Sequence, residues 1–172
     1  MADPSPFRPR EMLATLERHG VKYMVIGGLA AALHGSAHVT FDVDITPASD
    51  GDNLQRLSAA LREMDARVRA EGHPDGLVFR HDGRSLGRAG VWNLVTRFGE
   101  LDLSFVPTGT GGYEDLRRDS LVVDLRGVTV RVASLADVVR SKEAAGRPKD
   151  LLALPTLRRL LEAQLRAPRP PR

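Results

Sequence analysis

Hydrophobic and polar residues recur along the chain with two different periods. Apolar residues at three- and four-residue steps between Asp52 and Glu71 predict one long amphipathic helix. A shorter stripe predicts a helix over residues 10–19, and the alanine-rich segment 29–34 favours another. Strand-like runs bounded by turn residues are expected at residues 21–26, 38–46, 77–80, 91–97, 100–106, 121–125 and 128–132.

The segment 38–46, HVTFDVDIT, has the clearest two-residue period. In a strand, that period places one set of side chains on a single face, which we expect to lie in the core: Val39, Phe41, Val43 and Ile45. The opposite face carries Asp42 and Asp44. Aspartate is a poor strand former, so two of them on one strand call for an explanation beyond secondary structure.

The C-terminal third is predicted to be helical. Ser134 and Asp137 resemble a capping box at the start of one helix, which residues 146–148 interrupt. A second helix is expected from Lys149, and Pro155 should kink or restart it. The fold class is therefore α+β, with a mixed sheet flanked by helices. We expect a loose N-terminus, a core domain, a helical segment packed on that core and a disordered tail, at residues 1–9, 10–133, 134–165 and 166–172.

Composition narrows the class of protein. The 172 residues are 42% hydrophobic and 27% charged, which suits one globular domain with a sizeable core. The sequence has no cysteine, which excludes disulfides, thiolate metal sites and cysteine nucleophiles. No apolar run resembles a signal peptide or a membrane span, so we expect a cytoplasmic protein without a membrane partner. The net charge of +3 is compatible with an anionic partner.

The aspartates suggest a metal site. Asp42 and Asp44 would lie on one side of their strand, with Cβ atoms roughly 7 Å apart, and would repel each other unless a cation lay between them. Mg²⁺ prefers such carboxylate ligands together with substrate phosphates. On the strand 100–106, the apolar residues take the core face and Asp102 takes the other. If the two strands are neighbours, three carboxylates can hold two metal ions for phosphoryl transfer.

Gly27 and Gly28 follow the strand 21–26 as a turn before the helix 29–34. Such a turn leaves backbone N–H groups free to hold a phosphate, and glycine permits close approach. Taken singly, a Gly-Gly pair is most often only a turn, and an Asp-x-Asp pair is often a surface feature. The ordered combination of strand, Gly-Gly, short helix and Asp-x-Asp strand points to a functional site.

This combination resembles the nucleotidyltransferase superfamily of the polymerase-β type. Its signature is a Gly-Gly or Gly-Ser pair, then Asp-x-Asp/Glu, then a later carboxylate, here Asp102. The string GGLAAALHGSAHVTFDVDI and the C-terminal SLADVVRSKEAAGRPKDLLAL are most similar to the AbiEii-type subgroup, the toxins of bacterial toxin–antitoxin pairs. The chain departs from the family pattern at two places. The second motif residue is Gly28, followed by Leu29, where many relatives have Gly-Ser, so a side-chain hydroxyl for the phosphate is missing. His38 stands where the subgroup often has arginine.

The resemblance implies a nucleotidyltransferase-like core and a role for each matching residue. The metal ions would bind Asp42, Asp44 and Asp102, and Asp102 would help to deprotonate the attacking hydroxyl. The nucleoside triphosphate would contact the remaining matched residues, which are Gly27, Gly28, Thr40, Lys142 and Asp150. Two of these residues have another explanation that stays open. Lys142 could be a solvated helix residue, and Asp150 could be an acidic residue that the helix dipole favours at a helix N-terminus.

The implied activity is Mg²⁺-dependent transfer of a nucleoside monophosphate from an NTP to a hydroxyl acceptor. The resemblance makes tRNA the leading acceptor and a cognate antitoxin protein a partner. A second hypothesis is nucleotidylation of a small molecule such as an aminoglycoside or lincosamide. A third is a catalytically idle member that acts as a binding or regulatory module. The sequence leaves open which NTP is used and how the chain oligomerises.

Overall fold

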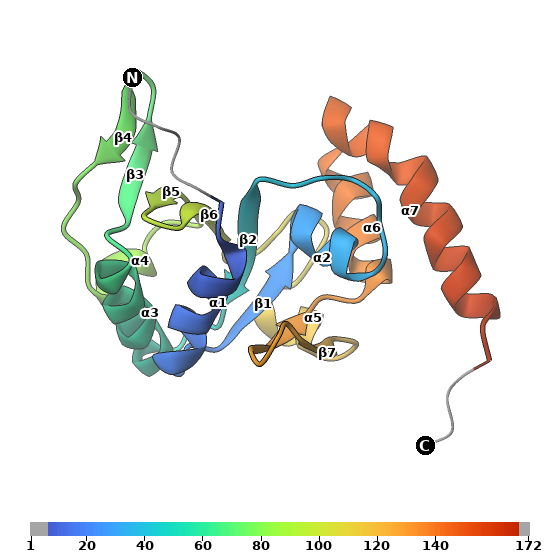
Figure 1. Ribbon diagram of the computed structural model, residues 1–172, viewed down its shortest axis with the longest axis horizontal. Helices are drawn as coiled ribbons and strands as arrows, with labels where there is room; N and C mark the ends of the chain where they lie inside the picture. The colour runs from blue at the N-terminus through green and yellow to red at the C-terminus, as the bar shows by residue number, and fades with distance from the viewer. Residues whose placement is uncertain (1–6, 169–172) are drawn as a thin grey trace.

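The computed structural model describes residues 7–168 of the chain. This part of the chain folds around one mixed β-sheet (Figure 1). Its eight strands lie in the order β4-β3-β5-β6-β2-β1-β8-β7. They are β1 (Tyr23–Ile26), β2 (Asp42–Pro47), β3 (Arg67–Ala70), β4 (His73–Leu77), β5 (Val91–Thr96), β6 (Gly99–Ser104), β7 (Leu121–Asp124) and β8 (Thr129–Val132). The predicted α+β class and the hairpin of β5 and β6 are confirmed.

Seven helices accompany the sheet in this described part of the chain. They are α1 (Pro9–Arg18), α2 (Gly27–Leu33), α3 (Gly51–Glu63), α4 (Gly83–Leu86), α5 (Tyr113–Arg117), α6 (Leu135–Ala145) and α7 (Pro148–Arg166). The short helices α4 and α5 lie in segments for which no helix was expected. None of the described helices is both long and apolar enough to cross a membrane.

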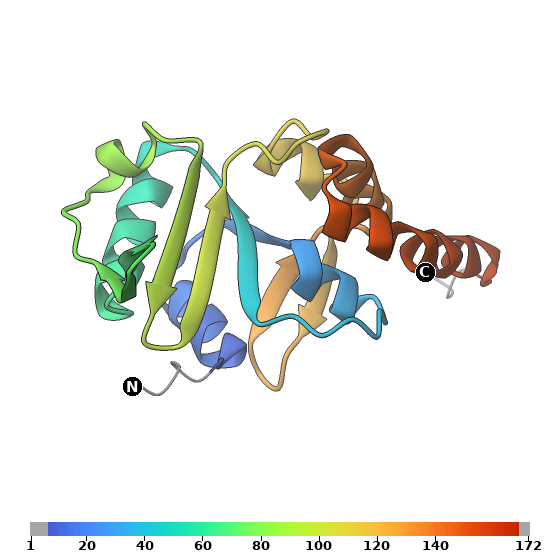
Figure 2. The ribbon, with the colours of Figure 1, turned by 90° about the horizontal axis from the view of Figure 1, so that it is seen from above.

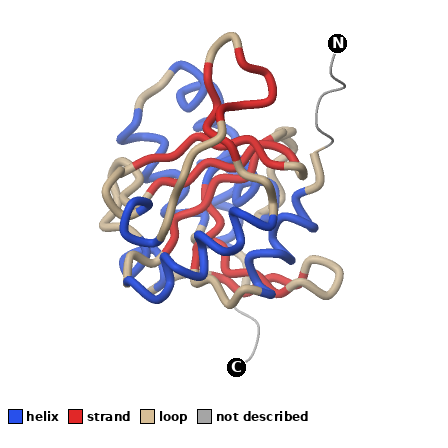
Figure 3. Tube along the Cα trace, turned by 90° about the vertical axis from the view of Figure 1, so that its left-hand side faces the viewer, coloured by secondary structure: helices blue, strands red, loops and turns tan. Residues whose placement is uncertain are grey.

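The core forms where α1 and α3 pack against the central strands. Leucines of β5 and β6 are fully buried there together with apolar residues of both helices: Leu94, Leu101, Leu103, Leu13, Leu16, Leu57 and Leu61. Figure 3 shows strands running through the middle of the molecule with helices on the outside, and the β3–β4 hairpin rising above them. The core face of β6 thereby fixes the direction of the residues between its leucines, including Asp102.

The long helix predicted between Asp52 and Glu71 is shorter in the structure. Helix α3 ends at Glu63, and Asp65 adopts a left-handed conformation with φ of 51°, so the chain turns and forms β3. Val68 continues the helical spacing only by coincidence, because it pairs with Leu94 across the sheet. The strand expected at residues 77–80 is displaced: β4 ends at Leu77, and its Pro and Gly are tolerated because it is an edge strand.

The strand expected at residues 38–46 begins only at Asp42. Val43 and Ile45 are buried as predicted, but Val39 and Phe41 are 77% and 74% exposed, so their expected place in the core was wrong. The physical reason is pairing. The ladder between β1 and β2 ends at Ile26, where the chain enters α2, and the ladder between β2 and β6 begins at Asp42.

The C-terminal helices agree in part with the sequence pattern. The Ser134 hydroxyl accepts a hydrogen bond from the Asp137 backbone N–H at 3.0 Å, and Gly146 ends α6 in a left-handed conformation. Helix α7 passes through Pro155 without restarting, contrary to one form of the prediction, and extends away from the sheet (Figure 2). Pro155 lies on the exposed side of the helix, where water can replace the lost backbone bond. The expected loose segment and tail lie mostly in residues 1–6 and 169–172, outside the described residues.

Candidate active site

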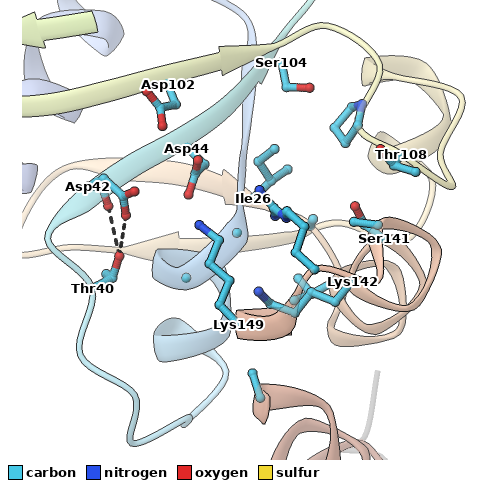
Figure 4. Close-up of a pocket in the computed structure, with 18 of the residues that line it drawn as sticks. Ile26, Thr40, Asp42, Asp44, Asp102, Ser104, Thr108, Ser141, Lys142 and Lys149 are labelled. Atoms are coloured by element: carbon cyan, nitrogen blue, oxygen red, sulfur yellow. Dashed lines mark hydrogen bonds between the residues drawn. The ribbon is translucent and has the colours of Figure 1, made fainter. Parts of the chain in front are cut away.

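Three carboxylates meet on neighbouring strands. Strand β2 pairs with β6 in parallel, and Asp44 is the direct partner of Asp102 in that ladder. One carboxylate oxygen from each of Asp42, Asp44 and Asp102 lies within 4.8 Å of the other two (Figure 4). The sequence-predicted triad is therefore brought together by the register of two strands that are far apart in sequence.

The crowding of negative charge perturbs the triad. Burial, followed by repulsion from Asp42 and Asp102, raises the pKa of Asp44 from its ordinary 3.8 to about 7, although two lysines oppose the rise. Burial also raises the pKa of Asp102, against the influence of Arg69. Three clustered carboxylates whose repulsion the neighbouring cations only partly offset fit a hard divalent cation, which would favour their ionised forms.

Thr40 holds the first carboxylate in place. Its hydroxyl donates a hydrogen bond of 2.7 Å to Oδ1 of Asp42 and lies 3.3 Å from the Asp42 carbonyl oxygen (Figure 4). Thr40 also lines the cavity described below. Thr40, which is predicted to contact the nucleotide, therefore also orients a carboxylate of the triad.

Gly27 and Gly28 are the first two residues of α2 rather than a turn in front of it, so the expected helix 29–34 starts earlier. Gly27 has a positive φ of 64°, and a Cβ there would overlap the carboxylate of Asp44. A Cβ on Gly28 would lie 2.9 Å from the Thr40 hydroxyl oxygen. The glycines thus leave the room that the carboxylate and the threonine occupy, next to the cavity.

Lys142 and Asp150 form a buried ion pair at the far side of the site. The Lys142 Nζ lies 3.0 Å from Asp150 Oδ1, and the Arg147 Nε lies 2.6 Å from Asp150 Oδ2. Burial alone would raise the pKa of Asp150, but hydrogen bonds from these two cations outweigh it, so the pKa lies below its usual range. Lys142 lines the cavity, whereas fully buried Asp150 lies behind it and positions the lysine.

Two cationic residues at the site were missed from the sequence. Lys149 lines the cavity and points toward the carboxylates from the first turn of α7 (Figure 4). Its place directly before Asp150 in the segment RPKD was the available signal. Arg69 of β3 forms ion pairs with Glu100 and, at 2.5 Å, with Oδ1 of Asp102. No signal pointed to Arg69, since the sequence pattern placed it on a helix.

The site opens into a cavity of about 740 Å³. Its lining includes the triad, both glycines, Lys142 and Lys149, together with four other polar residues: Asn93, Ser104, Thr108 and Ser141. The exposed His38, which stands at a position of departure from the toxin subgroup, also lines it. A cavity of this size that combines carboxylates with lysines can hold a phosphorylated ligand through a bridging metal ion.

The fold is similar to that of solved nucleotidyltransferases. A candidate nucleotidyltransferase from Thermotoga maritima matches with a TM-score of 0.55 and 18% identity, over 91% of this chain and 96% of that one. The antibiotic-resistance factor ANT(2'')-Ia matches with a TM-score of 0.54 and 16% identity, over 91% of this chain and 83% of that one. The same enzyme in complex with adenylyl-2''-tobramycin gives 0.54 and 16%, over 91% and 88%.

Neither a protein-family model nor a curated protein sequence matches the chain. At this level of identity, the structural likeness shows the fold. The nucleotidyltransferase-like fold expected from the sequence is therefore confirmed, while the AbiEii-type subgroup stays a prediction.

Proposed function

We propose that the protein is a metal-dependent nucleotidyltransferase that transfers a nucleoside monophosphate from an NTP to a hydroxyl acceptor. The observation that carries this proposal is the convergence of Asp42, Asp44 and Asp102 within 4.8 Å in a cavity that also presents lysine side chains. Carboxylates alone would repel a triphosphate, and lysines alone would bind it without chemistry. Their combination provides a place for both phosphates and metal.

In this proposal the triad would hold divalent cations. Mg²⁺ is the expected ion, because carboxylate oxygens are the hard ligands that it prefers. Such ions neutralise charge on the phosphates and activate the hydroxyl. Lys142 and Lys149 bind the negatively charged phosphate oxygens, and the buried ion pair with Asp150 keeps Lys142 directed into the cavity. Thr40 keeps Asp42 oriented through its hydrogen bond.

The transfer itself is an in-line displacement. The acceptor oxygen forms a bond to the α-phosphorus, the bond from that phosphorus to the bridging oxygen of the β-phosphate breaks, and pyrophosphate leaves. In this proposal the acceptor proton goes to Asp102, the role that the resemblance to the polymerase-β-type nucleotidyltransferases implies for this carboxylate.

For the acceptor we propose the hydroxyl of an RNA end, with tRNA first, and a role as the toxin of a cytoplasmic toxin–antitoxin pair. A polycationic drug would be expected to meet extra acidic residues beside the triad. The acids that line the cavity besides the triad are Glu100 and Asp137, and each is already paired, with Arg69 and Arg140 respectively. The net charge of +3 also favours an anionic acceptor.

Nucleotidylation of an aminoglycoside is the second candidate. The observation that favours it is the likeness to ANT(2'')-Ia, which was solved with adenylyl-2''-tobramycin bound. A catalytically idle binding module is less well supported, because a chain without catalysis has no need to keep three mutually repelling carboxylates together.

The test incubates the protein with Mg²⁺ and each labelled NTP, with total tRNA in one arm and a panel of aminoglycosides in the other. Label in tRNA, lost in Asp42→Ala but kept in the exposed control variant Asp119→Ala, supports the first proposal. Label in a drug alone supports the second candidate. Absence of transfer in both arms, with folded protein and bound metal, contradicts an enzymatic role and leaves the binding module.

A further inference from the structure

Phe41 is the one strongly exposed aromatic residue in the described part of the chain. It is 74% exposed, whereas the other phenylalanines, both tyrosines and the tryptophan are buried or half-buried there. Its neighbour Val39 is 77% exposed, and both residues line the cavity of the candidate active site. We call residues 38–41, which lead from α2 into β2, the rim segment.

The rim segment is held next to the triad. Thr40, between Val39 and Phe41, donates its hydrogen bond to the Asp42 carboxylate, and Gly28 packs against the same threonine. Phe41 therefore cannot move far from the cavity mouth while Thr40 stays bonded. Leaving a phenylalanine in water forgoes the favourable burial that its neighbours Val43 and Ile45 obtain, so an apolar surface fixed at this place indicates a ligand that covers it.

The cavity and the rim segment select the chemistry of that ligand. The cavity floor is ionic, with carboxylates and lysines, while its rim presents a flat apolar ring and a branched aliphatic side chain. A nucleotide has the matching division, since its phosphates are charged and its base is a flat ring that stacks well on aromatic side chains. A compact polyhydroxylated cation would gain little from this rim.

Resting on the nucleotidyl transfer proposed above, we propose that Phe41, flanked by Val39, is the stacking platform for a nucleobase. The base belongs either to the NTP or to the terminal nucleotide of an RNA acceptor. Both bases have the same stacking chemistry, so separate measurements of NTP binding and of tRNA binding distinguish the two cases.

The test compares Phe41→Ala with Phe41→Trp, and with Leu152→Ala as a matched control that removes a 79% exposed side chain outside the cavity lining. Calorimetry with Mg²⁺ measures binding of each of the four NTPs and of inorganic tripolyphosphate, which has the charge but no base. Binding of total tRNA is measured separately without NTP. Loss of one stacking contact is expected to weaken binding by roughly 5- to 150-fold.

If Phe41→Ala weakens an NTP but leaves tripolyphosphate within about twofold, and Phe41→Trp restores the affinity, the platform holds the base of the NTP. If NTP binding is unchanged but tRNA binding weakens with the same rescue, the platform holds an acceptor base. Unchanged binding of both, or an equal loss for tripolyphosphate, overturns the proposal. If the unaltered protein binds no tripolyphosphate with Mg²⁺, the proposed function itself fails, which is a separate result.

Discussion

Replacing Asp44 by asparagine should stabilise the metal-free protein. The substitution keeps the shape of the side chain and removes the charge that burial and the two neighbouring aspartates make unfavourable. The same substitution should remove most of the stabilisation that Mg²⁺ gives to the unaltered protein. The order of the two stabilities is therefore expected to reverse when metal is added.

The size of the effect follows from the pKa of Asp44. Its rise from 3.8 to about 7 corresponds to about 4 kcal/mol, and partial exposure of the side chain reduces this to roughly 1–3 kcal/mol. Because the folded protein keeps this proton to a higher pH than the unfolded chain does, the Asp44 carboxyl does not destabilise the unaltered protein below about pH 4. The unaltered protein loses stability as the pH rises through 7, so the advantage of Asp44→Asn is full only above that pH.

The assay is urea unfolding of both proteins with EDTA at pH 4 and pH 8, followed by the same measurement with Mg²⁺ at pH 8. Asp44→Asn should be more stable than the unaltered protein at pH 8 without metal and less stable with it. Asp119→Asn, which changes an exposed carboxylate, should follow the unaltered protein throughout. If Asp44→Asn is less stable than the unaltered protein at pH 8 in EDTA, the assignment of repulsion to this site is refuted.

Three further outcomes are expected. Gly27→Ala should lower Mg²⁺ affinity at least about tenfold by calorimetry, because the methyl group overlaps the Asp44 carboxylate and the positive φ disfavours alanine; unchanged affinity would contradict the tight fit. Arg69→Gln should raise the affinity for Mn²⁺ without nucleotide several-fold, since it removes a competing cation, whereas Arg67→Gln on the same strand should not; equal effects would argue against a specific role. Leu57→Ala should cost about 2–5 kcal/mol in urea unfolding, because this fully buried leucine leaves a cavity in the core; a cost below about 1 kcal/mol would be inconsistent with that packing.

The triad could be predicted from the sequence because strand periodicity fixes side-chain direction. Once Leu101 and Leu103 are assigned to the core, Asp102 must face the other way, and the same holds for Asp42 and Asp44 around Val43. The sequence alone leaves the pairing of β2 with β6 as an assumption. It is a tertiary fact, and the register that places Asp44 beside Asp102 becomes visible only in the sheet.

Arg69 and Phe41 could not be placed from the sequence, for different physical reasons. The helical spacing of apolar residues continues past Met64, so the sequence pattern keeps Arg69 on a helix. The turn that ends the helix depends on Asp65, and aspartate can adopt a left-handed backbone but does not by itself predict one. Phe41 fits the two-residue alternation of the strand, but it precedes Asp42, the first residue of β2 that pairs with β6. Periodicity predicts which residues would share one face of a strand. Pairing with neighbouring strands decides whether that segment belongs to the sheet and buries that face.

The division of the site along the chain has a consequence for synthesis. The carboxylates of β2 and β6 leave the ribosome before α6 and α7, which carry Lys142 and Lys149. A nascent chain that has reached only β8 holds the three carboxylates and Arg69, but neither of the two lysines. The proposed triphosphate site is therefore complete only after translation has passed residue 149, so its assembly depends on the last two helices.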